Sequence, residues 1–394
     1  MKRRELLKTA AKGAAAAIVV PAVTHVAAAT TMVLRGRYRL SAASEQMYSA
    51  RAVELVQRST VIDMLAPLWL DTPIEIKMLG NPENFKAEDF SPFRESGINV
   101  FHIAEATLGT DAYLRTLQVL SGWNTFLARH DAWFERVETP ARLDGIKSSG
   151  KIGILLGVQN SEHFREIDDV DYFYGLGQRI SQLTYNFRTL IGNGCYERRD
   201  DGLSDFGLAV VERMNKVGMA VDVSHSGDRT TLDAFDVSKK PVLITHSNCR
   251  ALNPTVPRCK TDEAIKAMAA KGGVMGITEV RDYVSAKEPT TVESMLDHYD
   301  YVAKLVGVDH LGIGSDIDLN GYDALPPEEI KKDYRSGGKA NEGIREKLDV
   351  DGLKFSKRPF EIAEGLIRRK YSDANIEAIL GGNFRRVLKE IWTA

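Results

Sequence analysis

The sequence predicts an α/β protein with a (β/α)8 TIM-barrel fold, and three observations support this fold. From Thr60 onward, short β-rich runs alternate with amphipathic segments. The runs number eight, whereas an open doubly wound sheet normally stops at about five to seven strands. Histidines and aspartates close several runs, and such a barrel collects its chemistry at the carboxyl ends of its strands. We expect one barrel domain over residues 30–394.

Each predicted strand is a run of β-branched and other apolar residues. The eight runs are 60–68, 98–106, 152–160, 180–186, 219–225, 242–246, 273–279 and 311–317. Apolar residues recur at helical spacing between them, most clearly in 110–130, 206–218 and 291–307, and glycine or proline lies near many joints. Strand, helix and strand in succession predict parallel pairing.

The composition fits a globular enzyme and gives no indication of a nucleic-acid partner. The chain has 394 residues, 43% of them hydrophobic, and a net charge of −2. No long basic stretch follows the N-terminal region, so we expect no nucleic-acid partner. Three cysteines are too few for a disulfide scaffold. Cys249 and Cys259 flank one loop, and whether they pair is left open.

The N-terminus resembles a twin-arginine export signal. MKRRELLK places Arg3 and Arg4 ahead of an alanine-rich apolar stretch, and an A-x-A cleavage site ends before Thr30. We therefore expect residues 1–29 to be a signal peptide, the twin-arginine export machinery to be a partner, and the mature protein to lie in the periplasm. The alternative is an uncleaved, membrane-associated anchor.

Two histidines at the ends of consecutive predicted strands are the strongest functional signal. His225 closes GMAVDVSH and His246 lies in PVLITHS. One parallel βαβ unit joins them, so both imidazoles should emerge side by side at the carboxyl edge of the sheet. HLGIGSDID adds Asp316 and Asp318. Imidazoles with a carboxylate are a ligand set for Zn²⁺, so we expect a barrel of the metal-dependent hydrolase type.

Several motifs together resemble the renal or membrane dipeptidase family, the M19 metallopeptidases. They are GMAVDVSHSGDRTTLDAFDVSKKPVLITHSNCRAL, QLTYNFRTLIGNGC, GGVMGI, GIGSDID and GGNFRRV. The resemblance implies that His225 and His246 hold zinc and that Arg250 clamps a substrate carboxylate, for which its planar fork is suited. It also implies that Asp316 assists the hydrolytic water, with Asp318 as a substitute.

The chain departs from the family pattern at four positions. Leu65 and Pro67 stand where a His-x-Asp pair would hold a second zinc, Gln159 replaces a bridging glutamate, and Tyr185 replaces a substrate-binding histidine. The usual two-zinc site therefore should not form. One zinc on His225, His246 and Asp316, or none, remains. Three strand-end carboxylates could supply a missing ligand: Glu105, Glu162 and Glu279.

The expected function is hydrolysis of a dipeptide or a related small amide with one zinc ion per chain. Asp316 would be catalytic, and Arg250, Tyr185 and Gln159 would bind the substrate. Two alternatives stay open: a repurposed relative acting on a modified peptide such as a siderophore precursor, and a non-catalytic binding protein on the same barrel. The resemblance implies a homodimer. Residues 320–352 are polar and form a candidate lid.

Overall fold

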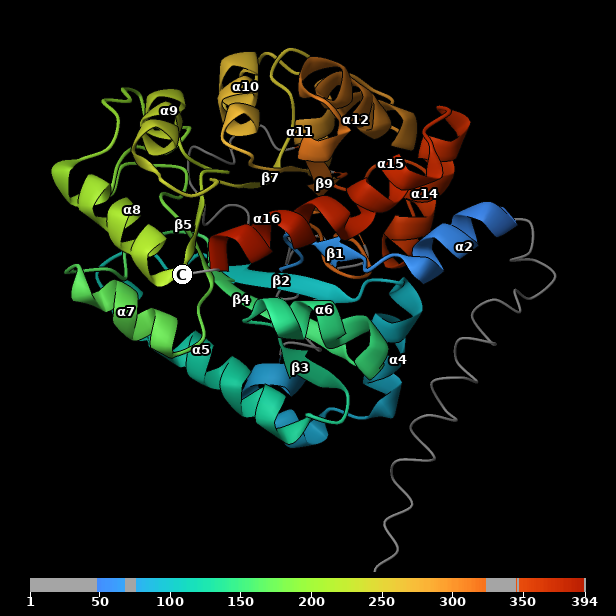
Figure 1. Ribbon diagram of the computed structural model, residues 1–394, viewed down its shortest axis with the longest axis horizontal. Helices are drawn as coiled ribbons and strands as arrows, with labels where there is room; N and C mark the ends of the chain where they lie inside the picture. Colours follow the sequence, from blue (N-terminus) through green and yellow to red (C-terminus); the bar gives the residue numbers. More distant parts are fainter. Residues whose placement is uncertain (1–47, 68–75, 324–344, 346, 393–394) are drawn as a thin grey trace, which may run out of the picture. The chain divides into compact units, whose positions relative to one another are not determined.

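The computed structural model describes residues 48–67, 76–323, 345 and 347–392. Its centre is an eight-stranded parallel barrel in the order β6-β5-β4-β2-β1-β9-β8-β7 (Figure 1). The strands are β1 (Ile62–Asp63), β2 (Val100–Glu105), β4 (Ile152–Val158), β5 (Ile180–Gln182), β6 (Ala220–Asp222), β7 (Ile244–Ser247), β8 (Met275–Ile277) and β9 (Leu311–Ile313). The predicted barrel is confirmed.

The seam between β6 and β7 closes the barrel through a short parallel bridge. Asp222 pairs with Leu243. Leu243 N donates to Val221 O at 2.9 Å, and Val223 N donates to Leu243 O at 3.0 Å. This seam carries both predicted histidines on its two sides.

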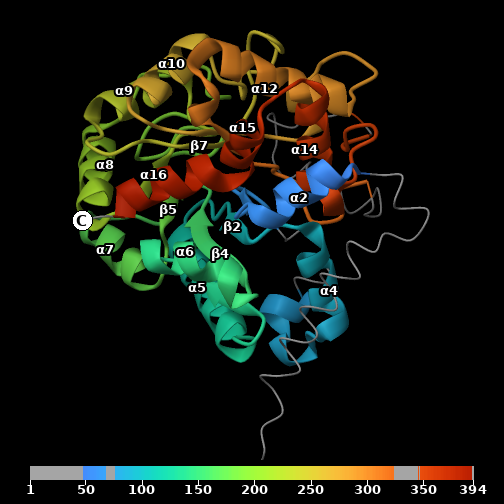
Figure 2. The same cartoon turned by 45° about the vertical axis from the view of Figure 1, so that its right-hand side comes forward.

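Helices surround the strands (Figures 1 and 2). The α-helices are α2 (Ala50–Arg58), α4 (Ala87–Ser96), α5 (Ala112–Arg129), α6 (Pro140–Ser149), α7 (Asp168–Gly175), α8 (Asp205–Val217), α9 (Asp228–Val237), α10 (Asp262–Ala270), α11 (Arg281–Val284), α12 (Val292–Val306), α14 (Arg358–Arg368), α15 (Asp373–Glu377) and α16 (Asn383–Trp392). The predicted segments 110–130, 206–218 and 291–307 match α5, α8 and α12 to within two residues at each end.

Helix α16 packs against the N-terminal ends of the strands. Phe384, Val387, Leu388 and Ile391 share one apolar cluster with residues at or near the strand starts, namely Ile62, Val100, Ile180, Ala220, Leu243 and Val274. Burial of this apolar face stabilises the helix on the barrel. It also leaves the carboxyl ends of the strands for polar side chains.

The strand boundaries and one strand differ from the prediction. The regular strands are shorter than the apolar runs, because the chain leaves the sheet before the polar residues that close several runs. Residues 134–136 form β3 (Phe134–Arg136), which pairs with β4 outside the barrel. Three residues are too few to show an alternation of apolar and polar side chains, so no sequence pattern predicted this strand.

Several predictions concern residues that the structure does not describe. The signal peptide 1–29 lies outside the described residues, as does most of the candidate lid 320–352. The cysteine question is answered: Cys195, Cys249 and Cys259 are free, buried thiols. No helix within the described part of the chain combines the length and the apolar character needed to cross a bilayer.

Candidate active site

His225 and His246 meet at the carboxyl end of the β6–β7 seam. Their Nε2 atoms lie 3.1 Å apart, and their ring centroids are 5.1 Å apart. Both side chains are buried. Burial lowers the pKa of each imidazole well below its usual value, and the positive charge of Arg258 lowers it further. Both rings are therefore neutral, which is the state that binds a metal ion.

A β-bulge in β7 directs the second histidine. Ile244 pairs with Met275 and Ser247 with Ile277, so three steps in β7 face two in β8. Such a bulge re-aims the side chains within it. Gly276 and Gly314 make room for it, because a Cβ at either position would lie 2.1 or 1.9 Å from Thr245 O.

Two buried cations bind the backbone around the histidines. Arg258 donates from Nη1 to Ser224 O at 2.6 Å and from Nη2 to His246 O at 2.8 Å. Lys260 donates from Nζ to Ser226 O at 2.8 Å, and burial lowers its pKa to about 7. These contacts tie the ends of β6 and β7 together and make this side of the barrel positive.

Asp316 and Tyr185 are the partly accessible residues beside the buried pair. Tyr185 stacks on His225 with centroids 4.3 Å apart and planes inclined by 21°. Asp316 follows β9 with a left-handed φ of 57°, and no described residue donates a hydrogen bond to its carboxylate. Burial raises its pKa to about 7, with Arg258 opposing the shift. Asp316 can therefore exchange a proton near neutral pH.

The positions that would hold a second zinc carry uncharged side chains. Leu65 is fully buried, and Leu65 O accepts from Asp316 N at 2.8 Å. Gln159 Nε2 donates to Ala104 O at 3.0 Å. Neither Leu65 nor Pro67 has a metal-binding side-chain atom, and a neutral amide is a weak ligand.

Arg250 faces a carboxylate of the protein itself. Its Nη1 and Nη2 donate to Asp228 Oδ2 and Oδ1 at 2.5 and 2.8 Å, and Nε donates to Cys259 O at 2.9 Å. This bidentate pair joins the loop after β7 to the N-terminus of α9. The carboxylate clamp inferred for Arg250 stays a prediction, and in this conformation its fork is occupied.

The carboxylates proposed as replacement metal ligands each have different neighbours. Glu162 Oε2 accepts from Gly109 N at 2.7 Å. Glu279 lies 3.5 Å from Arg358, and Asp318, the alternative to Asp316, gives its backbone oxygen to the same arginine. Glu105 ends β2. Among the described residues, no group of three or more His, Cys, Asp or Glu side chains could hold a metal ion.

The imidazole pair alone fits part of a zinc site. Two nitrogens at ~2.0–2.1 Å from one tetrahedral zinc would lie about 3.4 Å apart, close to the observed 3.1 Å. The third ligand expected from Asp316 is not assembled with them. The residues present therefore supply two converging donors, and the rest of the coordination stays a prediction.

Sequence reasoning missed Arg258 and Lys260. The run Pro257-Arg258-Cys259-Lys260 resembles an ordinary solvated loop, yet both side chains are almost fully buried. A long polar stretch directly after a functional strand end was the available signal, because loops at the carboxyl face of a barrel line its site.

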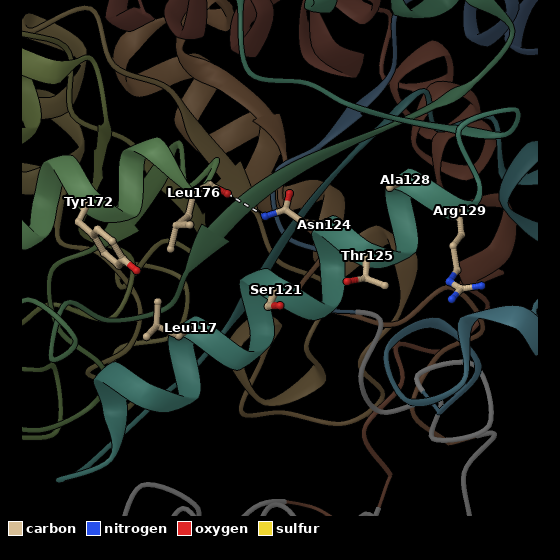
Figure 3. Close-up of a pocket in the computed structure, with 8 residues that line it drawn as sticks. All are labelled: Leu117, Ser121, Asn124, Thr125, Ala128, Arg129, Tyr172 and Leu176. Atoms are coloured by element: carbon tan, nitrogen blue, oxygen red, sulfur yellow. Dashed lines mark hydrogen bonds between the residues drawn. The ribbon is translucent and has the colours of Figure 1, made fainter. Parts of the chain in front are cut away.

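A groove elsewhere on the molecule contains none of this chemistry. It encloses about 750 Å³ between α5 and the end of α7, and Figure 3 shows Asn124 Nδ2 donating to Leu176 O at 3.0 Å beside it. The lining residues are Leu117, Ser121, Asn124, Thr125, Ala128, Arg129, Tyr172 and Leu176. Its lining contains no imidazole and no carboxylate that could activate the hydroxyls of Ser121 and Thr125, so the strand ends remain the candidate site.

A parallel barrel with two imidazoles converging at its carboxyl edge is the arrangement expected of a metal-dependent hydrolase. Residues 50–333 match the model of the membrane dipeptidase family, peptidase family M19. The chain therefore belongs to this family.

Individual relatives agree with the assignment. Dipeptidase verJ of Clonostachys rogersoniana is 30% identical over 70% of this chain and 65% of its own length. An amidohydrolase from Pseudomonas aeruginosa is 28% identical, with a TM-score of 0.75 over 87% of this chain and 99% of that one. The probable dipeptidase PvdM from Pseudomonas aeruginosa has the same fold, at 18% identity and a TM-score of 0.72 over 92% and 99% of the two chains. The chain spans between about half and two thirds of the curated relatives it matches.

Proposed function

We propose that this protein hydrolyses a dipeptide or another short amide, with one zinc ion held by His225 and His246. The observation that carries the proposal is the 3.1 Å approach of two buried, neutral imidazole nitrogens at the mouth of the barrel. Membership of a metallopeptidase family supports the reaction class. A zinc ion held there would supply Lewis acidity and lower the pKa of bound water.

The protein's own residues supply proton transfer and charge recognition. Asp316 is partly accessible and titrates near neutral pH, so it can take a proton from water and return it to a leaving amine. Arg258 and Lys260 attract a substrate that carries a carboxylate. Tyr185 covers His225 and would limit the size of the group beside it.

We also propose the location and the assembly. The twin-arginine-like N-terminus supports export to the periplasm. A homodimer is proposed from the family resemblance. The substrate is a small molecule with peptide character, and a siderophore precursor or another modified peptide is one member of that class.

The test is a joint measurement of metal and turnover on the purified full chain. About one zinc per chain after loading, with hydrolysis of at least one member of a dipeptide panel, is the expected result. The same chain treated with a chelator serves as the control. A chain that retains no zinc and cleaves no panel member would falsify the proposal.

A non-catalytic binding protein is the second candidate. It is favoured by the absence of an assembled third ligand among the described residues and by the uncharged side chains of Leu65 and Gln159 at second-zinc positions. Calorimetry that shows dipeptide binding without turnover, in a chain that holds no zinc, would select this candidate.

A further inference from the structure

A buried chain of hydrogen bonds leads from Asp222 through Thr245 to His246. We propose that Asp222 and Thr245 are positioning residues that force the Nε2 lone pair of His246 into the site, while Asn186 does the same for His225. The inference rests on the proposed function, since the oriented nitrogens are those that would take the cation.

Asp222 acts only as an acceptor and receives four hydrogen bonds. Its Oδ1 accepts from Ser224 N, Ser224 Oγ and Thr245 N at 3.0, 2.6 and 3.1 Å. Its Oδ2 accepts from Thr245 Oγ1 at 2.7 Å. The β7 bulge brings Thr245 into this position. Both neighbouring hydroxyl protons are thereby committed to Asp222, because each hydroxyl has only one.

The tautomer of His246 follows from that proton count. His246 Nδ1 lies 2.8 Å from Thr245 Oγ1, whose proton already goes to Asp222. The hydroxyl can therefore only accept, so Nδ1 of His246 carries the ring proton. An imidazole whose one proton is on Nδ1 has none on Nε2, so Nε2 presents its lone pair to the site.

His225 reaches the same state through a different partner. Its Nδ1 lies 2.8 Å from Asn186 Oδ1, an acceptor, so Nδ1 again carries the proton. Two lone pairs then face each other at 3.1 Å. The two holders differ in charge: an amide oxygen orients His225, whereas a carboxylate acting through a hydroxyl orients His246. Outer partners of this kind raise the basicity of a ligating imidazole, and the carboxylate should raise it more.

The test compares hydroxyl deletions at two strand ends. Thr245→Val removes the link to His246, and Thr245→Ser restores the hydroxyl. Thr278→Val is the matched control, since Thr278 is also buried at a strand end and its hydroxyl donates to a backbone oxygen, Ser315 O, at 3.0 Å. The readouts are ¹⁵N NMR of the histidines in the metal-free full chain and zinc affinity by chelator competition.

In the wild type, His225 and His246 should each show a protonated Nδ1 and an unprotonated Nε2. Thr245→Val should allow His246 to carry its proton on Nε2, while the tautomer of His225 stays unchanged. It should also weaken zinc binding about 10–100-fold. Thr245→Ser should restore both properties, and Thr278→Val should leave both unchanged. If Thr245→Val does not fold, the wild-type spectrum still shows which nitrogen of His246 carries the proton.

A wild-type His246 with its proton on Nε2 overturns the inference, as does an equal loss of affinity in Thr278→Val. A wild type that shows the expected tautomers but holds no zinc overturns the proposed function and leaves the positioning intact. The two failures are therefore distinguishable.

Discussion

The two sides of the barrel mouth bury different sets of titratable groups. At the β6–β7 side, two neutral imidazoles lie beside the guanidinium of Arg258 and the amine of Lys260, whose pKa burial lowers to about 7. At the β8–β9–β1 side, Asp63 and Glu279 surround the single guanidinium of Arg358. The first side is the proposed reactive site, whereas the ion pair and hydrogen bonds of the second hold strands together. Burial of polar groups at a barrel mouth therefore does not by itself identify a catalytic site.

The ion pairs at the β8–β9–β1 side explain its structural role. Arg358 donates from Nη1 to Asp63 Oδ2 and to Ser315 Oγ, both at 2.7 Å, and from Nη2 to Asp318 O at 2.5 Å. It thereby joins α14 to β1 and to the loop after β9. Glu279, 3.5 Å away, receives no hydrogen bond on either carboxylate oxygen among the described residues.

The largest expected effect is the loss of activity in His246→Ala. Removing the imidazole of His246 should abolish hydrolysis and zinc retention, because the described residues offer no third ligand to replace it. His310→Gln is the control, since His310 lies at the opposite end of β9 and bonds to Gly273 O. Activity on the substrate panel and zinc content measure the outcome. Full activity in His246→Ala would exclude the histidine pair from the reaction.

The second effect concerns stability at the acidic side. Arg358→Met should lower the free energy of unfolding by about 3–5 kcal/mol, because it leaves the buried carboxylate of Asp63 without its cation. Arg368→Met on the same helix is the control. Its partner Glu293 is largely exposed, so its loss should cost about 1 kcal/mol or less. Denaturant unfolding measures both variants, and equal losses would contradict the assignment.

The third effect is a change in the pH dependence of stability. Burial raises the pKa of Glu279 from 4.5 to about 8, with Arg358 opposing the shift. The folded state therefore keeps this proton to higher pH than the unfolded chain. The stabilising contribution is complete below about pH 4.5 and is lost as the pH rises towards about 8.

Glu279→Gln should remove that pH dependence. As the pH rises across this window, the unfolding free energy of the variant should increase relative to that of the wild type by up to about 1.4 kcal/mol per pH unit. Urea unfolding at several pH values between 5 and 9, roughly the titration range, provides the measurement. Parallel curves for the two proteins would show that Glu279 does not titrate as its burial implies.

Sequence reasoning predicted the barrel and the imidazole pair because both depend on local patterns. Apolar runs and strand-end positions determine where His225 and His246 emerge, whatever their neighbours are. Arg258, Asn186 and Asp222 were not predicted as site residues. Their roles depend on a bulge in β7 and on loops that fold back over the strand ends. Such contacts join residues distant in sequence, and no periodicity records them.

The last prediction concerns the role of Arg250, for which only a small change in stability is expected. The resemblance implies a clamp for a substrate carboxylate, whereas the structure pairs its fork with Asp228. Asp228 is 47% exposed, so this pair should contribute at most about 1 kcal/mol to stability.

A double-mutant cycle with Arg250→Ala and Asp228→Ala separates the two roles. If Arg250 mainly orders the loop after β7, the two single variants should lose similar stability, the double variant should lose less than their sum, and KM should change little. A clamp predicts instead that Arg250→Ala raises KM sharply while Asp228→Ala does not. A rise in KM in Arg250→Ala alone would make Arg250 part of the substrate site. Similar stability losses with little change in KM would leave substrate recognition to Arg258 and Lys260.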